Sequence, residues 1–343
     1  MRTEDNGKNM NKDLAGKTDA QDILARVQAL VGREIVESEE IFTEELSSRH
    51  PYVRDVLKHM NSYRGKRLRP MLLLLSGAAA GELEHAHKVL AAVVEMIHTA
   101  TLVHDDVLDE AQIRRHVATV NSRYNNETSV LLGDYLFTHA FHLASSLEST
   151  LACRLIGRAT NLVCEGELAQ IHERGNIDLT EETYLEIIEG KTAELCAICC
   201  YLGAHFSGAP EQVAKAFDSY GRSLGIAFQI ADDLLDVWGN EEQTGKSLGS
   251  DFEKQKLTLP VIHLMANSSP ARCQRVRDLL QNPSKEARLE LRGLLDQSDS
   301  VEYSHRRAFE YAAAARAQLA CVPESTARSL LEELTEFASQ RSA

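Results

Sequence analysis

Apolar side chains recur at intervals of three and four residues along most of the chain, which is the spacing of one face of an α-helix. This spacing predicts helices over residues 22–34, 71–80, 87–104, 129–147, 151–172, 180–204, 211–236, 257–266 and 305–320. Alternating patterns bounded by Asn-Gly or Asp-Gly turns, which predict strands, are nearly absent. The pattern therefore predicts an all-α protein of many long helices around one core.

Short polar segments separate these helices. GNIDLT precedes a helix that we expect Thr180 to cap, with Glu181 and Glu182 favourably placed in its first turn. SGAP at 207–210 separates two further helices, and NSSPAR and QNPSKE predict loops near 267–285. Residues 1–20 are polar and predict a disordered leader. No later shift in composition marks a boundary, so residues 21–343 are predicted to form one domain.

Composition narrows the class of protein. The 343 residues are 43% hydrophobic and 26% charged, which suits a soluble chain with a sizeable core. The formal charge of −14 argues against a general nucleic-acid binder, because a phosphate backbone requires a basic face. The polar N-terminus lacks the apolar region of a signal peptide, and Glu95 and His98 interrupt the most apolar stretch. We therefore predict a cytoplasmic protein with no transmembrane segment.

The cysteines do not predict a disulfide framework. There are seven, an odd number, and they are scattered through long periodic segments. Cys196, Cys199 and Cys200 lie on one helical face, but no second pair with zinc-ligand spacing follows them. Core packing is therefore the favoured interpretation of this cluster over metal binding.

Two acidic motifs carry the strongest chemical signal. The first, HDDVLD at 104–109, places Asp105 and Asp109 one helical turn apart, with Asp106 beside them. The second, DDLLD at 232–236, repeats the arrangement with Asp232, Asp233 and Asp236. Each motif ends an apolar run, where a carboxylate is costly unless it is paired or bound to a cation. Two matching copies make solvated helix ends the less favoured interpretation.

Carboxylates without partner His or Cys side chains select hard cations, and Mg²⁺ commonly bridges carboxylates and substrate phosphates. The chain also supplies cations that suit a phosphate, since Arg can bind it in a bidentate manner and Lys as a point charge. A single basic residue more often faces solvent, but these lie beside Gly, Pro or an acidic motif. They are Lys66, Arg67 and Arg69 in GKRLRP, Arg114 and Arg115, Lys191 in GKT, and Lys246 and Lys256 in GKSLGSDFEKQK.

Together, the segments GKRLRP, HTATLVHDDVLDEAQIRR, GKTAEL and FQIADDLLDVWGNEEQTGKSLGSDFEKQKLTLP resemble the trans-isoprenyl diphosphate synthases, or polyprenyl synthetases. The resemblance covers about residues 20–340 and is strongest to the long-chain members, such as octaprenyl and heptaprenyl diphosphate synthases, that make quinone side chains. It implies a single-domain helical bundle around a deep central cavity, and a homodimer. It also implies a reaction that joins an allylic diphosphate, here expected to be farnesyl diphosphate, to isopentenyl diphosphate and releases pyrophosphate.

The resemblance assigns roles to the motif residues. Asp105, Asp109, Asp232 and Asp236 would ligate Mg²⁺, with Asp106 and Asp233 beside them, and the metal would stabilise the departing diphosphate. The allylic substrate or its diphosphate would contact Arg114, Lys191, Thr192, Gln229, Lys246 and Lys256. The isopentenyl diphosphate site would comprise Lys66, Arg69, His98 and Arg115. No protein nucleophile is implied.

The roles that the resemblance assigns are less direct for three histidines. A lone His among apolar residues is usually a core residue, and only the motif match favours a phosphate-binding role for His98. His104 is expected to be structural or to support the aspartates. His116 stands where the family usually has Gly, which would permit a turn with positive φ. Either His116 tolerates that geometry or the loop is shifted, and a shift would displace Arg114 and Arg115.

Product length is predicted from the turn before Asp105. A helical side chain covers the turn N-terminal to its own Cα, which places Ala100 and Thr101 below the metal site. Both are small, whereas bulky aromatic residues in the family stop growth here, so an open tunnel and a long product are expected. Phe137, Phe141 and Leu147 could form a deeper floor, although such a stripe is more often plain core.

Other functions remain open at this point. TGKS at 244–247 resembles part of a nucleotide-binding P-loop, but Asn240 stands where the loop needs Gly, and a helix precedes it instead of a strand. The complete isopentenyl diphosphate set argues against a terpene cyclase. A short-chain synthase that makes farnesyl or geranylgeranyl diphosphate, and a subunit of a heteromeric synthase, are the alternatives within the family.

Overall fold

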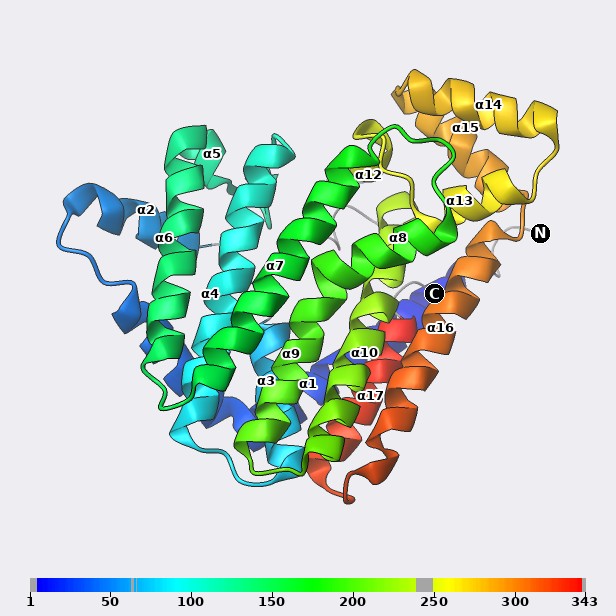
Figure 1. Ribbon diagram of the computed structural model, residues 1–343. Coiled ribbons are helices and arrows are strands. Elements are labelled where there is room, and N and C mark those ends of the chain that lie inside the picture. The colour runs from blue at the N-terminus through cyan, green and yellow to red at the C-terminus, as the bar shows by residue number, and fades with distance from the viewer. Residues whose placement is uncertain (1–4, 63–64, 66, 239–248, 341–343) are drawn as a thin grey trace.

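The structure is a computed structural model that describes residues 5–62, 65, 67–238 and 249–340 (Figure 1). The all-α prediction is confirmed, because helices make up nearly all of its regular structure. In chain order the helices are α1 (Asp5–Glu45), α2 (Pro51–Asn61), α3 (Leu68–Ala80), α4 (His85–Leu108), α5 (Val120–Arg123), α6 (Asn126–Ser145), α7 (Thr150–His172), α8 (Glu181–Ile188), the π-helix η1 (Glu189–Ala193), α9 (Glu194–Phe206), α10 (Glu211–Trp238), α12 (Ser250–Glu253), α13 (Leu259–Ala266), α14 (Pro270–Gln281), α15 (Lys285–Asp296), α16 (Ser300–Gln318), the 3₁₀-helix η2 (Leu319–Cys321) and α17 (Thr326–Gln340).

The periodic segments are helical where the apolar spacing predicts them, and the predicted cap of α8 is confirmed. The Thr180 hydroxyl accepts a hydrogen bond from the backbone N–H of Thr183 at 3.2 Å. The loops predicted at NSSPAR and QNPSKE are present at 267–269 and 282–284, and the helix α14 between them was not predicted. Ser269 caps α14 and Pro270 occupies its first turn, a start signal that outweighs the weak apolar spacing of this segment. α1 extends back to Asp5, and disorder of residues 1–20 stays a prediction.

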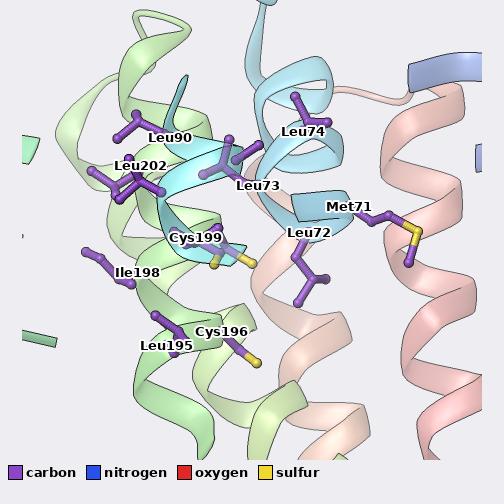
Figure 2. Packing of buried hydrophobic residues seen from close by; sticks show 14 of the residues in the cluster. Met71, Leu72, Leu73, Leu74, Leu90, Leu195, Cys196, Ile198, Cys199 and Leu202 are labelled. Atoms are coloured by element: carbon purple, nitrogen blue, oxygen red, sulfur yellow. The ribbon is translucent and has the colours of Figure 1, made fainter. Parts of the chain in front are cut away.

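The centre of the protein is α3, which is apolar on all sides and contacts α1, α4, α9 and α17. Figure 2 shows its side chains Leu72, Leu73 and Leu74 among residues of α4 and α9. Cys196 and Cys199 lie in the same cluster and are fully or almost fully buried. The core-packing interpretation of the cysteines is therefore confirmed. α3 and α9 approach closely at Gly203, where a Cβ atom would overlap the carbonyl oxygen of Leu73.

The long helices α4, α7, α9 and α10 run side by side, and both acidic motifs lie at the ends of such helices (Figure 1). α4 and α10 end at the same end of the protein, near α12. By length and composition α4 could cross a membrane, but 72% of its apolar window is buried inside the structure. This degree of burial is typical of the core helix of a soluble protein.

One small strand pair interrupts the helical pattern in the described part of the chain. β1 (Ile113–Arg114) and β2 (Val117–Ala118) pair antiparallel, with Ile113 opposite Ala118 and Arg114 opposite Val117. This hairpin directly follows the first acidic motif, so it determines where the two arginines lie.

Candidate active site

The two acidic motifs have the same burial pattern. In the first, Asp105 and Asp109 keep 21% and 18% of their side-chain surface exposed, whereas Asp106 keeps 1%. In the second, Asp232 is exposed and Asp236 is partly buried, whereas Asp233 is buried. The outer aspartates therefore remain accessible to a ligand, and the middle aspartate of each motif is turned into the protein.

Asp106 holds the hairpin in place. Its Oδ1 atom accepts a hydrogen bond from Arg114 Nε at 2.8 Å, and Arg114 Nη2 forms an ion pair with the same atom at 2.8 Å. Burial raises the pKa of Asp106 above its ordinary value, although the bond to Arg114 opposes this shift. A buried carboxylate needs such a partner, so Asp106 and Arg114 fix each other. The metal-ligand role predicted for Asp106 stays a prediction.

The turn of the hairpin answers the question raised by His116. Arg115 and His116 have φ angles of 52° and 65°, as both central residues of a type I′ turn require. His116 therefore adopts the left-handed conformation that the family's glycine would permit. The Arg115 guanidinium lies against Gly65, where a Cβ atom would overlap it. The GKRLRP segment and the second arginine are thus brought together, as predicted.

Lys191 lies in a π-helix between two close helix contacts. A Cβ atom at Gly166 of α7 would lie 2.5 Å from the backbone nitrogen of Lys191, and one at Gly225 of α10 would lie 2.6 Å from Ala193 Cα. Residues larger than glycine at positions 166 and 225 would not permit this packing. The ammonium group of Lys191 lies 3.8 Å from Asp105 Oδ2 and forms an ion pair with Glu167. π-Helical turns of this kind are frequent at functional sites.

The pKa values at Lys191 and Asp105 follow from burial and pairing. Burial alone would lower the pKa of Lys191, but Asp105 and Glu167 outweigh it and raise the pKa. Burial raises the pKa of Asp105, and Lys191 opposes that shift. No motif in the sequence singled out Glu167, which lies between helical core positions of α7.

Asp233 is the acceptor in a hydrogen-bonded network. Its carboxylate accepts from the Tyr184 hydroxyl at 2.6 Å and from Gln229 Nε2 at 2.7 Å. The Thr192 hydroxyl in turn donates to Gln229 Oε1 at 2.8 Å. Burial, and next the charge of Asp251, raise the pKa of Asp233 to about 8. Thr192 and Gln229 were predicted here, whereas Tyr184 was not, because a tyrosine at helical spacing also fits plain core. The metal-ligand role predicted for Asp233 stays a prediction.

Asp109 lies among three cations. Its carboxylate oxygens are 3.1 Å from Arg174 Nη2, 3.3 Å from Lys254 Nζ and 3.2 Å from Lys256 Nζ. Burial alone would raise the pKa of Asp109, but Lys256 and Lys254 outweigh it and hold the pKa below its ordinary value. Lys256 was predicted from its motif, whereas Arg174 and Lys254 were missed.

A cavity of about 120 Å³ lies beside these groups. Its lining includes Tyr184, Lys191, Thr192, Gln229, Asp233 and Lys256. Four residues predicted to contact the allylic substrate thus surround one cavity, and two of them, Lys191 and Lys256, also reach the first acidic motif. Ala100 and Thr101 are not among the described residues that line it.

Among the described residues, the others that the sequence predicts for the site do not line this cavity. Ala100 is fully buried, and Thr101 is half-buried and donates to the His98 carbonyl at 2.8 Å. Arg69 lies in the first turn of α3 with its Nε atom buried. His104 lies 3.0 Å from the Val130 carbonyl of α6, which agrees with a structural role. Phe137, Phe141 and Leu147 pack against the main core, and Lys66 and Lys246 lie outside the described residues.

The donor chemistry of the two motifs fits a hard divalent cation. The accessible ligands are carboxylate oxygens, which hard divalent cations prefer. Lys191 and Lys256 already offset part of the negative charge of Asp105 and Asp109. Within the described residues, however, no three His, Cys, Asp or Glu side chains form a ready-made metal cluster. Asp105 and Asp109 could hold Mg²⁺ only together with further oxygens, such as those of a diphosphate.

Comparison with known proteins supports the same interpretation. A family model described as polyprenyl synthetase matches residues 50–294. The octaprenyl diphosphate synthase of Escherichia coli is 35% identical over 93% of this chain and 99% of its own length. An all-trans-nonaprenyl-diphosphate synthase of Rhodobacter capsulatus is 37% identical over 94% and 98%. The crystal structure of a Caulobacter crescentus polyprenyl synthase complexed with calcium and isoprenyl diphosphate covers 93% of this chain and 98% of its own, with a TM-score of 0.89 and 35% identity.

Replacing His116 with glycine should stabilise the protein. His116 has a φ of 65°, a conformation that costs a residue with a Cβ atom about 1 kcal/mol more than glycine. The His116→Gly variant should therefore gain roughly 1 kcal/mol in free energy of unfolding, measured by urea denaturation. A loss of stability would mean that side-chain contacts of His116 outweigh the strain.

The raised pKa of Asp233 predicts a pH-dependent stability. Between its ordinary pKa of 3.8 and the folded value of about 8, the native state holds a proton that the unfolded chain has lost. The free energy of unfolding should therefore fall as pH rises from about 5 to about 8, with at most roughly 1.4 kcal/mol per pH unit from this group. Asp233→Asn cannot ionise and should fall less steeply, in urea titrations without divalent metal. Identical pH profiles for Asp233→Asn and the unmodified chain would refute the assignment, and Asp278→Asn on α14 serves as the control.

Proposed function

Because the chain belongs to the polyprenyl synthetase family, we propose that it is a magnesium-dependent trans-prenyltransferase that makes a long-chain polyprenyl diphosphate. Its substrates would be isopentenyl diphosphate and an allylic diphosphate, for which farnesyl diphosphate is the proposed primer. One observation carries the proposal. Lys191 and Lys256 line the same cavity as Thr192, Gln229 and Asp233, and both also reach the first acidic motif.

The basic side chains would form two groups, one for each substrate diphosphate. Lys191 and Lys256 would hold the diphosphate of the allylic substrate and neutralise the charge that develops as its carbon–oxygen bond breaks. Mg²⁺ held by Asp105, Asp109, Asp232 and Asp236 would supply further Lewis-acid stabilisation of that charge. Arg115 and Arg69 would hold isopentenyl diphosphate, with Arg115 positioned by the hairpin that Asp106 anchors through Arg114.

The chemistry needs little else from the protein. The electron pair of the broken bond leaves with the diphosphate, and the allylic carbon forms a bond with the double bond of isopentenyl diphosphate. A proton is then lost from the new chain, and the departed pyrophosphate is the proposed acceptor. The chain contributes positioning and charge, which agrees with the absence of a catalytic nucleophile from the motif pattern.

The relatives support a long product, and we propose in addition that this product supplies a quinone side chain. The octaprenyl and nonaprenyl synthases align over nearly their full lengths with this chain. The small side chains of Ala100 and Thr101 one turn before Asp105 agree with it.

We also propose that the protein is a cytoplasmic homodimer. Leu131 of α6 and Leu168 of α7 expose 67% and 66% of their surface, which is unusual for large apolar residues and offers an interface. Sedimentation equilibrium of the purified chain would report its mass in solution.

The proposed function is tested by incubating the purified chain with Mg²⁺, farnesyl diphosphate and labelled isopentenyl diphosphate, and sizing the products by mass spectrometry. We expect products of about seven to ten isoprene units, because the small side chains of Ala100 and Thr101 would leave the path of the growing chain open. Asp105→Asn should reduce turnover at least about a hundredfold, because it removes charge from the accessible face of the first motif. No incorporation by the chain alone would indicate a missing partner subunit.

Replacing Ala100 with phenylalanine should shorten the product to about three or four isoprene units, because the ring would block the path below Asp105. Ala100 is fully buried, so the variant should also lose roughly 1–3 kcal/mol of stability through overpacking. Product sizes are therefore compared at a temperature where circular dichroism shows both proteins folded. An unchanged product length in a folded, active variant would refute the placement of the tunnel.

A further inference from the structure

The motif resemblance assigns no role to Arg174 or Lys254. Both reach the first acidic motif, and we propose that they bind the substrate diphosphate. Arg174, Lys254 and Lys256, named here the basic triad, surround Asp109. The triad would compete with a divalent cation for Asp109, and it would bind the diphosphate that accompanies the cation. This inference deepens the proposed function and rests on it, and it assigns Arg174 and Lys254 to the site.

The triad surrounds a single carboxylate. Arg174 and Lys256 approach Asp109 Oδ1 at 3.1 and 3.2 Å, and Lys254 approaches Oδ2 at 3.3 Å. Arg174 and Lys254 each keep 27% of their side-chain surface exposed, and Lys256 keeps 12%. Three cations therefore share one carboxylate, in a chain whose formal charge is −14.

The backbone is built to bring these cations together. Gln255, between Lys254 and Lys256, has a φ of 53°, which is costly for a residue with a Cβ atom. This left-handed residue turns the chain so that both flanking lysines reach the same carboxylate. The turn is closed by hydrogen bonds from the Gln255 N–H to the Phe252 carbonyl at 3.1 Å and from the Lys256 N–H to the Asp251 carbonyl at 2.8 Å.

The turn that carries Arg174 is docked on the same segment. The Gly175 N–H donates to the Gln255 carbonyl at 2.9 Å, and Gly175 itself has a φ of 74°. Two left-handed residues from separate turns are thus hydrogen-bonded to each other, and the cations beside them converge on α4. Strain retained at such a junction is typical of functional sites.

The cations around the first motif suit an anionic ligand. Among the described residues, the basic groups paired with this motif or with Glu167 beside it are Arg114, Lys191, Arg174, Lys254 and Lys256. A divalent cation bound at Asp109 would compete with three of them for that carboxylate, and a diphosphate offers them another acceptor.

If Lys254 competes with a metal for Asp109 and also binds the diphosphate, Lys254→Gln should change the affinities for these two ligands in opposite directions. A lysine that neutralises Asp109 competes with a metal, so its loss should tighten binding of Mn²⁺ alone. The same lysine should bind pyrophosphate once the metal is present, so its loss should weaken pyrophosphate binding. A lysine with a purely structural role would not separate the two measurements in this way.

The experiment titrates the full chain with Mn²⁺ alone and with pyrophosphate in saturating Mg²⁺, by isothermal calorimetry without turnover. For Lys254→Gln we expect Mn²⁺ to bind about threefold more tightly and pyrophosphate roughly tenfold more weakly. Arg174→Gln, on the other turn, should change both affinities in the same directions. Lys215→Gln, which removes an equal charge from an exposed pair with Glu211, is the matched control and should change neither.

The outcomes separate this inference from the proposed function. If the unmodified chain neither binds pyrophosphate nor elongates an allylic diphosphate, the proposed function fails. If it does both, and the two variants match Lys215→Gln or weaken binding of both ligands, the competition at Asp109 is overturned while the synthase assignment stands. Tighter Mn²⁺ binding together with weaker pyrophosphate binding in both folded variants establishes the basic triad.

Discussion

The structure depends on the compensation of carboxylates that are buried where apolar helices end. α4 and α10 carry their acidic motifs into partly buried surroundings, where an unpaired charge would cost several kcal/mol. Each compensated aspartate recruits a partner from a distant segment: Asp106 recruits Arg114, Asp105 recruits Lys191, and Asp109 recruits the basic triad. The hairpin, the π-helix and the turns at 175 and 255 each carry one or more of these partners to the aspartates.

Close helix packing makes those distances possible. Gly166 and Gly225 let α7 and α10 press on the π-helix from two sides, so the backbone of Lys191 lies deep between them while its ammonium group reaches Asp105. A rigid site of this kind suits a reaction in which the protein positions charges and supplies no nucleophile. The same constraint explains why small residues appear in α7 and α10 where helix propensity alone would favour larger ones.

Sequence reasoning predicted the long helices because apolar spacing persists over many turns in each. It predicted the loops on either side of α14 but not the helix itself, which is short and has weak apolar spacing. It also did not predict the hairpin, whose strands contain two residues each. Within the site, Lys191, Thr192, Gln229 and Lys256 came from motifs and do share one cavity. Glu167, Arg174 and Tyr184 have no motif of their own, and nothing singles out Lys254 within GKSLGSDFEKQK. Only tertiary contacts reveal these four residues.

The two motifs look alike in sequence, yet their middle aspartates are stabilised by different chemistry. Asp106 has a guanidinium partner, whereas Asp233 accepts hydrogen bonds from the neutral groups of Tyr184 and Gln229. Burial, and next the charge of Asp251, raise the pKa of Asp233 to about 8, and its neutral donors oppose that rise less than a cation would. The first motif thus receives positive charge from the chain itself. A cation beside Asp233 would therefore stabilise the folded protein more than a cation beside Asp106. Within the described residues, Asp233 has only neutral hydrogen-bond donors, whereas Asp106 already has Arg114.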